Sequence, residues 1–228
     1  MNLRLLALAA TAATALVASG ASAATYTINT VAGVHITEPL ITDFNSTEGG
    51  ALQIAPGFTF DQGVNGLAFT RDGGFGLDSG ISAPPPADNL VPGAFYETVL
   101  GNGGSATLAA DTGLYNFQFY MGSPDSYNRV TFTFADGASP LVLQGVQIWG
   151  GSPDGNGDQS KGFTVSYHFN DAVKTVNFTS GNSNAFEFDK LAGGVPEPAS
   201  WALMILGFGG AGAVLRGQRR RQALAAVA

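Results

Sequence analysis

The sequence predicts an all-β fold: a single antiparallel β-sandwich of the jelly-roll type, with an N-terminal signal peptide before it and a C-terminal transmembrane helix after it. Glycine occurs 32 times and phenylalanine 16 times in 228 residues, and only 12% of the residues are charged. This composition is typical of a loop-rich β-protein with an aromatic core. Apolar residues alternate with period 2 in the middle of the chain, and no amphipathic helical stretch interrupts them, which favours short strands packed in two layers.

Residues 1–23 have the pattern of a secretory signal peptide. Arg4 forms the charged n-region, and residues 5–17 form the apolar h-region. The small residues Ala21 and Ala23 give the pattern that a signal peptidase accepts, so we expect cleavage before Ala24. The secretory translocon and signal peptidase are therefore the first expected partners of the chain.

Strand candidates follow one another through residues 24–193, which we interpret as one exported β-sandwich domain. The clearest alternation is found at residues 130–134, 163–169, 176–178 and 186–188. Less regular candidates are residues 26–31, 34–41, 58–60, 95–100, 114–121 and 141–149. Glycine-containing turns separate many of them. Gly193-Gly194 is the expected linker into the C-terminal segment, and Pro84-Pro85-Pro86 is expected in a surface loop.

The C-terminal segment, residues 194–228, contains an apolar run followed by an arginine cluster. The run over about residues 199–215 would be roughly 26 Å long as a helix, close to the roughly 30 Å hydrocarbon core of a bilayer. We therefore expect a transmembrane helix there. The positive-inside rule places the arginines of residues 216–221 in the cytoplasm and the β-domain on the opposite side of the membrane. These arginines are Arg216, Arg219, Arg220 and Arg221.

Just before the apolar run, two prolines keep the backbone extended and accessible to a processing enzyme. Pro196-Glu197-Pro198 (residues 196–198), then Trp201-Ala202, the glycine-rich run and the arginines resemble the PEP-CTERM sorting signal in its PEP-x-x-W-A variant. This signal is also known as the ice-binding protein C-terminal domain, a name that does not imply ice binding. An ordinary single-span anchor is the alternative interpretation.

The resemblance implies recognition by an exosortase, an integral-membrane transpeptidase. It implies an inner-membrane intermediate, cleavage near the PEP motif, and a final location at the cell surface, in the outer envelope or in the extracellular matrix of a Gram-negative bacterium.

The stretch YNFQFYMGSPDSYNRVTF, residues 115–132, predicts two strands joined by a polar turn. Gly122 permits a positive φ, Pro124 fixes the turn, and Asp125 can accept backbone N–H bonds within it. The stretch resembles the G-S-x-D-x-Y-N hairpin of a group of exosortase-dependent surface proteins. Phe186-Glu187-Phe188-Asp189, before the sorting signal, is similar to the same architecture.

The charge is divided between the β-domain and the tail. Residues 24–193 contain five Lys or Arg against sixteen Asp or Glu. Such an acidic domain would be repelled by nucleic acid and by anionic lipid, so neither is an expected partner. Cysteine is absent, which excludes disulfides, thiolate metal sites and cysteine nucleophiles.

No pattern in the sequence predicts catalysis, so we do not expect an enzyme. The triplets Asp78-Ser79-Gly80 and Asp111-Thr112-Gly113 are 33 residues apart, too close for the two lobes of an aspartic protease, and Asp-x-Gly is ordinary turn chemistry. His35 and His168 have no Ser or Asp partner at a motif spacing. Two histidines without cysteine also make a zinc site unfavourable.

Two binding hypotheses remain open. Asp154, Asn156 and Asp158 alternate as calcium ligands do, although Gln159 and Val165 replace the glycine and the closing glutamate of an EF-hand loop. A solvated loop without metal is the alternative, so calcium is the one cofactor hypothesis. Four aromatic residues could stack on the apolar faces of sugars, with core packing as the alternative. They are Tyr115, Tyr120, Tyr127 and Trp149.

The first functional hypothesis is therefore a non-enzymatic, exosortase-sorted surface or matrix protein, structural or adhesive in the cell envelope or in the exopolysaccharide of a biofilm. The alternative is an extracellular carbohydrate-binding module, calcium-dependent or not, with a polysaccharide as its partner. An extracellular hydrolase is a third hypothesis, for which the sequence offers no convincing acid/base pair.

Overall fold

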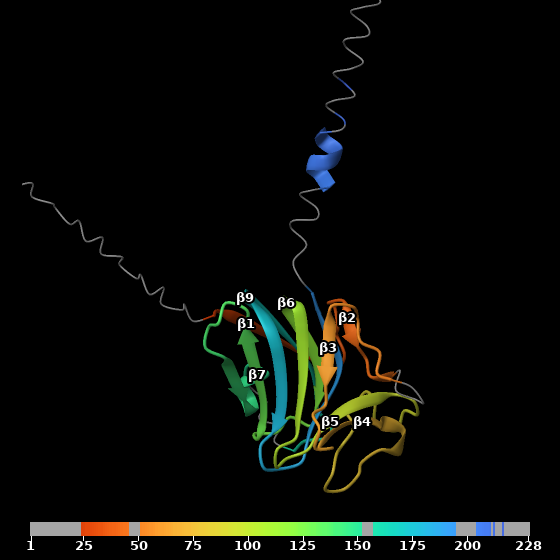
Figure 1. Ribbon diagram of the computed structural model, residues 1–228. Helices are drawn as coiled ribbons and strands as arrows, with labels where there is room; N and C mark the ends of the chain where they lie inside the picture. The colour runs from red at the N-terminus through yellow and green to blue at the C-terminus, as the bar shows by residue number, and fades with distance from the viewer. Residues whose placement is uncertain are drawn as a thin grey trace, which may run out of the picture.

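The computed structural model describes residues 24–45, 51–151, 157–194, 204–210, 212 and 216. Within these ranges, ten strands form one antiparallel sheet that curls strongly (Figure 1). The strands are β1 Tyr26–Ala32, β2 Leu40–Thr42, β3 Phe58–Asp61, β4 Ala68–Asp72, β5 Phe95–Val99, β6 Ser105–Gly122, β7 Asn128–Phe134, β8 Leu141–Gln144, β9 Gly162–Ser180 and β10 Phe186–Gly194.

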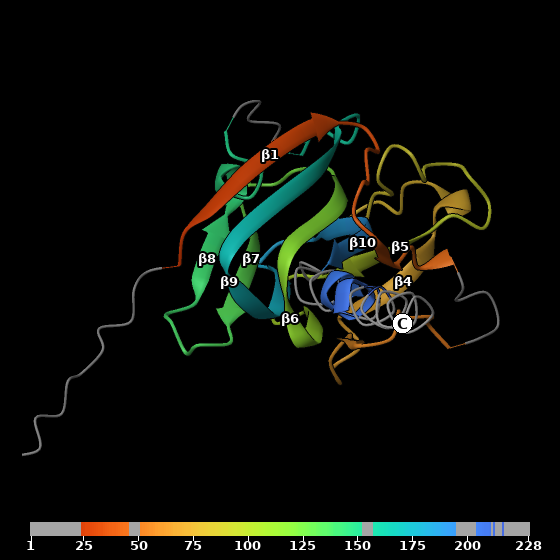
Figure 2. The same ribbon diagram turned by 90° about the horizontal axis from the view of Figure 1, so that it is seen from above.

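The strand order across the sheet is β4-β5-β10-β6-β9-β7-β8, and β1, β2 and β3 pair additionally with β9, β10 and β6. Seen from above, β1, β9 and β6 lie side by side, and the sheet continues round to β5 and β4 (Figure 2). The predicted antiparallel all-β fold is confirmed. The expectation of a two-sheet sandwich is corrected, because β6 and β9, with 18 and 19 residues, carry the hydrogen bonding through both halves of one curled sheet.

The pairing partners of β9 force this strand to bend. Gly122, at the end of β6, pairs with Gly162 at the start of β9, and Asn128, at the start of β7, pairs with Ser180 at its end. A straight strand of 19 residues would be about 60 Å long. The chain from residue 122 to residue 128 spans at most about 21 Å. Residues 123–127, which we call the closing connection, therefore hold the two ends of β9 close together, and the sheet curls around the space between.

Irregularities at the bend keep the apolar side chains on the inside of the curl. The ladder between β6 and β9 shifts its register around Leu114, which pairs with Val173. The buried aromatic and aliphatic residues of β9 are odd-numbered from 163 to 173 and even-numbered at 176 and 178. Side chains alternate between the two faces of a regular strand, so odd-numbered and even-numbered residues face opposite sides. A bulge, which inserts one extra residue, is needed for both sets to face the core.

Aromatic rings fill the inside of the curl. Phe119 lies among the rings of five residues, at centroid distances of 5.5–6.4 Å. These residues are Phe117, Tyr167, Phe178, Phe186 and Phe188, none of them more than 2% exposed. In a chain without cysteine, this packing supplies the main stabilisation of the β-domain.

Most of the predicted strands are present, with several differences. The candidate at residues 34–41 is strand only from Leu40, and β8 ends at Gln144, where the 3-10 turn η3 Gly145–Gln147 follows. The sequence had not indicated β4. Gly193, expected in a linker, pairs with Phe117 inside β10. A Cβ at Gly193 would lie 2.7 Å from the carbonyl oxygen of Asn116, so close packing explains this glycine.

The outer face of β10 is also covered. Residues 73–94, which we call the covering loop, begin with the 3-10 turn η2 Gly73–Phe75 and lie over β10. The amide of Ala83 donates a hydrogen bond of 2.8 Å to Glu187, and the side chain of Asp88 lies 3.3 Å from that of Lys190. Both faces of β10 are therefore removed from water, although only one of them is apolar.

The covering loop also packs against the end of β6. A Cβ at Gly122 would lie 2.5 Å from the Cα of Pro85, so this glycine permits a close approach of two backbones. The positive φ expected at Gly122 occurs instead at the next residue, Ser123, where φ is 43°. The three prolines lie in a loop, as expected, but Pro84 and Pro85 are buried and Pro86 is partly exposed.

Replacing Phe119 by alanine is expected to destabilise the protein by about 3–5 kcal/mol, because the ring fills a position surrounded by other rings and its loss leaves a cavity. Urea unfolding followed by fluorescence measures the change. Val64→Ala is the matched control: Val64 is fully exposed, and its truncation should cost no more than about 0.5 kcal/mol. Equal losses for the two variants would contradict the central position of Phe119.

Candidate functional site

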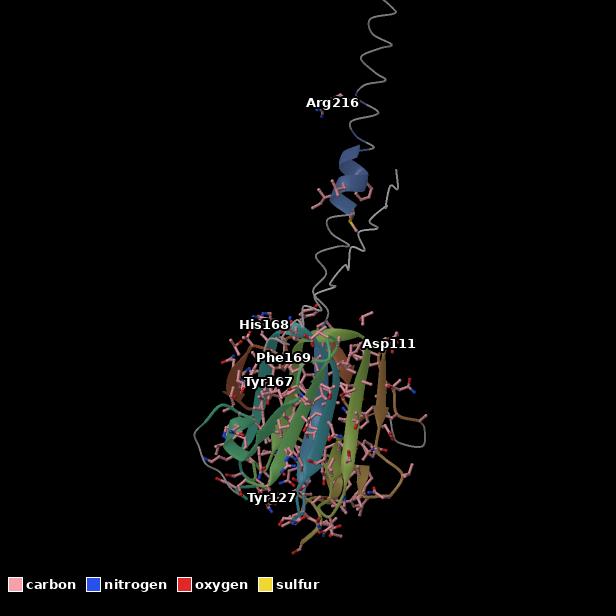
Figure 3. The ribbon with its side chains drawn as sticks, turned by 60° about the vertical axis from the view of Figure 1, so that its left-hand side comes forward. Asp111, Tyr127, Tyr167, His168, Phe169 and Arg216 are labelled. Atoms are coloured by element: carbon pink, nitrogen blue, oxygen red, sulfur yellow. The ribbon has the colours of Figure 1, made fainter. Side chains whose placement is uncertain are left out.

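A small cavity of about 110 Å³ lies where the closing connection, the covering loop and the start of β10 meet. Three carboxyl groups line it, those of Asp78, Asp125 and Glu187. Its other polar lining comes from hydroxyl and amide groups, on Ser82, Ser123, Tyr127, Gln159 and Asn184. We call it the acidic cavity. Tyr127 marks this end of the sheet in Figure 3, and His168 and Asp111 lie at the opposite end.

Glu187 is the most deeply buried of the three acids, at 2% exposure. Its Oε1 accepts a hydrogen bond of 2.8 Å from the amide of Ala83, whereas its Oε2 has no hydrogen-bond partner among the described residues. Burial, together with the carboxylate of Asp125, raises the pKa of Glu187 to about 8 against the lowering effect of the Ala83 amide. Without a cation nearby, Glu187 therefore holds a proton near neutral pH.

Asp125 comes from the closing connection and is 4% exposed. The hydroxyl of Tyr127 lies 2.8 Å from Asp125 Oδ2 and 2.7 Å from the carbonyl oxygen of Asn184, and shares its hydrogen between them. Burial raises the pKa of Asp125, while hydrogen bonds from Tyr127 and from the amide of Gly157 lower it. Burial, and then the neighbouring Asp125, raise the pKa of Tyr127. The hairpin motif thus places a buried acid in the cavity wall.

A second group of buried charges lies further along β10. Lys190 lies between Asp189 and Asp88, which are 0% and 2% exposed, and contacts both carboxylates. Burial raises the pKa of each acid. Burial acts to lower the pKa of Lys190, but the two acids outweigh it and raise that pKa. This group fastens the covering loop to β10 and does not line the acidic cavity.

The residues weighed for catalysis are not brought together. Asp78 lines the acidic cavity, whereas Asp111 lies at the opposite end of the sheet (Figure 3). The two Asp-x-Gly triplets therefore do not form a carboxylate pair. His35 and His168 are exposed, and Nδ1 of His168 lies 2.7 Å from the side-chain oxygen of an asparagine. The described contacts give no Ser-His or His-Asp arrangement at either histidine.

The four aromatic residues considered for sugar stacking do not form one platform. Tyr120 and Trp149 are 1% and 3% exposed. Trp149 belongs to the core, which was the alternative interpretation, and Tyr120 lies under the covering loop, where the amide of Ala87 donates a hydrogen bond to its hydroxyl. Tyr115 and Tyr127 are partly exposed. They lie far apart, because Tyr115 precedes the residue that pairs with His168 at one end of the sheet and Tyr127 lies at the other (Figure 3).

Of the predicted calcium ligands, Asp158 is within the described residues, and Asp154 and Asn156 are outside them. The carboxylate of Asp158 accepts hydrogen bonds from the amide and hydroxyl of Ser160, and it lies 3.8 Å from Lys161. Within the described ranges, no three His, Asp or Glu side chains are grouped so as to hold a metal ion. The neighbouring residues Gly157 and Gln159 do line the acidic cavity.

Part of the C-terminal segment is described, and its residues 204–210, 212 and 216 are helical (Figure 1). No helix in the described part of the chain is both long and apolar enough to cross a membrane. Arg216 is described (Figure 3), and Ala24 is the first described residue of the chain. The remaining signal-peptide, sorting and topology residues lie outside the described residues: Ala21, Ala23, Pro196, Glu197, Pro198, Trp201, Ala202, Arg219, Arg220 and Arg221.

The sequence did not identify Glu187 as a site residue. In an alternating strand such as FEFDK, the phenylalanines indicate the core face and the acids indicate a face in water. The covering loop, which removes the acids from water, carries no periodic signal of its own. The turn pattern of residues 122–128 did indicate Asp125 as a hydrogen-bond acceptor. Its proximity to Glu187 could not be predicted, because it depends on how the sheet closes.

The C-terminal segment matches a known family model. Residues 194–221 match the PEP-CTERM protein-sorting motif, which confirms the resemblance found in the sequence. The match begins at Gly194, the last residue of β10. No curated protein matches the chain.

Glu97 on β5 is a further buried acid and lies outside the acidic cavity. It is 0% exposed, and its Oε2 accepts a hydrogen bond of 2.7 Å from the side chain of Gln62. Burial raises its pKa from 4.5 to about 8, against the lowering effect of Gln62. The folded protein therefore keeps a proton that the unfolded chain releases, and the resulting stabilisation is fully present below pH 4.5 and is lost as the pH rises toward 8.

Glu97→Gln is expected to flatten the pH dependence of stability. Glutamine is neutral and still offers Gln62 an acceptor, so the variant should exceed the parent in stability at pH 8 by an amount on the order of a few kcal/mol. Urea unfolding midpoints of both proteins, measured at acidic and at mildly alkaline pH, test this. A parallel decline of the two proteins with rising pH would show that Glu97 is not the titrating group.

Proposed function

We propose that this protein is exported, is processed by an exosortase at its C-terminal sorting motif, and then acts without catalysis as a structural or adhesive component of a bacterial cell surface or extracellular matrix. The match of residues 194–221 to the PEP-CTERM protein-sorting motif carries this proposal. The predicted signal peptide at residues 1–23 supplies the corresponding route out of the cytoplasm.

The boundary between sheet and tail suits processing. Gly194 still pairs with Asn116 in the sheet, and the Pro-Glu-Pro sequence begins two residues later. The two prolines of this sequence favour an extended backbone over a helix, and an extended backbone would be accessible to a membrane enzyme. Cleavage at this position would leave every strand of the β-domain intact.

The apolar run and its arginines support a membrane intermediate. A helix over about residues 199–215 is only just long enough to span, and its glycines form a smooth face on which another helix can pack closely. Arginines after the run favour an orientation with the tail in the cytoplasm and the β-domain outside the inner membrane. In this proposal the apolar run is a transient membrane anchor that is removed by cleavage. The final location of the β-domain is the surface or matrix of a Gram-negative bacterium.

An adhesive or structural role is supported by the surface of the covering loop. Phe75 and Leu90 are 81% and 71% exposed, and Leu77 is 57% exposed. Large apolar side chains gathered on one exposed loop are typical of a contact surface. The separation of the residues weighed for catalysis also favours a non-enzymatic role. A carbohydrate-binding module is less well supported, because only Tyr115 and Tyr127 of the four aromatics remain partly exposed.

Changing Pro196, Glu197 and Pro198 together to alanine is expected to leave full-length protein in the inner membrane, because the extended recognition segment is lost. Immunoblots of membrane, surface and medium fractions measure the processed share in the native host. Val64→Ala, on the exposed surface of the β-domain, is the control and should be processed as the parent is. Unchanged release of the triple variant would refute the sorting proposal.

The adhesive role predicts a separate defect. Phe75→Ser combined with Leu90→Ser should leave export and processing intact but move the processed protein from the matrix to the medium, because both side chains are exposed and do not support the fold. The matrix-to-medium ratio should fall several-fold, while Val64→Ser leaves it unchanged. Retention of the double variant, together with loss of the Tyr127→Ala variant, would favour the carbohydrate-binding alternative.

A further inference from the structure

Two of the three acids that line the acidic cavity have no cationic partner among the described residues. Its described lining residues include Asp78, Asp125 and Glu187, and none of them is Lys, Arg or His. Asp78 is paired with Arg71, at 2.7 Å. In the described part of the chain, no ion pair involves Asp125 or Glu187, and the groups that donate hydrogen bonds to them are neutral.

The environment of Glu187 indicates which kind of ligand the acidic cavity can bind. The residue is 2% exposed, lines the cavity, and has one carboxyl oxygen, Oε2, without a hydrogen-bond partner among the described residues. A buried polar atom without a partner is unfavourable, and a buried charge without a partner is more so. A bound cation removes both penalties, because it coordinates the unpartnered oxygen and neutralises the negative charge of the carboxylate.

The cavity has room for such a ligand. Its volume of about 110 Å³ is several times the roughly 10–15 Å³ that one water molecule requires by the same kind of measure. A cation and several water molecules in its coordination shell therefore fit. A large organic ligand does not.

We infer that the acidic cavity binds one divalent cation, Ca²⁺ in preference to Mg²⁺ or Zn²⁺, with the carboxylates of Asp125 and Glu187 as its charged ligands. This site is independent of the sorting proposal. It also differs from the calcium loop that the sequence indicated, because Asp158 is engaged with Ser160 and lies beside Lys161.

The choice of calcium follows from the chemistry of the lining. The polar side chains there present oxygen atoms in carboxyl, amide and hydroxyl groups, and the described lining offers neither sulfur nor imidazole. Ca²⁺ accepts six to eight oxygen ligands in irregular geometry, including carbonyl groups and water, whereas Mg²⁺ demands a near-ideal octahedron and Zn²⁺ favours nitrogen and sulfur. Among the described residues, the one other acid that lines the cavity, Asp78, is paired with Arg71, and no group of three acids is found. A dissociation constant of about 10⁻⁴–10⁻³ M is therefore expected, as in extracellular calcium modules.

Bound calcium would fasten the two segments that meet at this end of the sheet. Asp125 belongs to the closing connection, and Glu187 belongs to β10. A ligand that binds only the folded state stabilises it by an amount that increases with the logarithm of the ligand concentration once this exceeds the dissociation constant. Calcium should therefore raise the melting temperature of the protein as well as occupy the cavity.

The test uses the full chain, purified in detergent near neutral pH. Thermal unfolding is measured at increasing CaCl₂, with MgCl₂ and NaCl at matched ionic strength as controls. Terbium luminescence, sensitised by tyrosine and displaced by calcium, gives a direct binding measurement on the parent protein. The variants are Glu187→Gln and Asp125→Asn, and the matched control is Glu97→Gln, which changes an equally buried acid outside the cavity.

We expect the parent melting temperature to rise by roughly 3–10 °C at about 10 mM calcium, with half-saturation at about 10⁻⁴–10⁻³ M. Glu187→Gln and Asp125→Asn should each weaken binding at least about tenfold, and Glu97→Gln should bind as the parent does. If one of the two cavity variants does not fold, the inference is tested by terbium displacement on the parent and on the other variant. The inference is overturned if the parent shows no calcium-displaceable terbium emission, if Mg²⁺ acts equally, or if both cavity variants bind as the parent does.

Discussion

The short closing connection between β6 and β7 is the constraint on which the rest of the β-domain depends. It joins strands that pair with opposite ends of β9, so that β9 and its partner β6 must both bend. Bending in turn requires a bulge where the two strands change direction, because the apolar side chains would otherwise turn outward. The curled sheet, the enclosed aromatic core and the position of Asp125 all follow from this one connection.

The closed fold buries acidic side chains of β10, which is energetically unfavourable. This strand packs its phenylalanines into the core, and the covering loop removes its other face, with Glu187 and Asp189, from water. Asp189 is compensated by Lys190, whereas Glu187 keeps one oxygen without a partner in the described part of the chain. Buried carboxyl groups therefore make the fold sensitive to pH, and at the acidic cavity they also create a place where a cation fits.

The alternation of apolar residues was enough to predict the antiparallel strands and the aromatic core. The change from odd to even positions between Val173 and Val176 is visible in the sequence, but it can be interpreted as a bulge only when the pairing of β9 is known. The covering loop could not be predicted, because its contacts with Glu187 and Gly122 join residues far apart in the chain. The sorting motif, by contrast, was recognisable because its order of parts is local.

In the proposed cation site, closure of the sheet brings Asp125 and Glu187 together around one bound ion. The most direct measurement is an anomalous difference map from crystals of the protein grown with calcium or a lanthanide. We expect one strong peak in the acidic cavity, with carboxylate oxygens of both residues at about 2.3–2.6 Å from it. A peak confined to the 154–158 loop, or a cavity without anomalous density, would show that Asp125 and Glu187 do not bind a cation together.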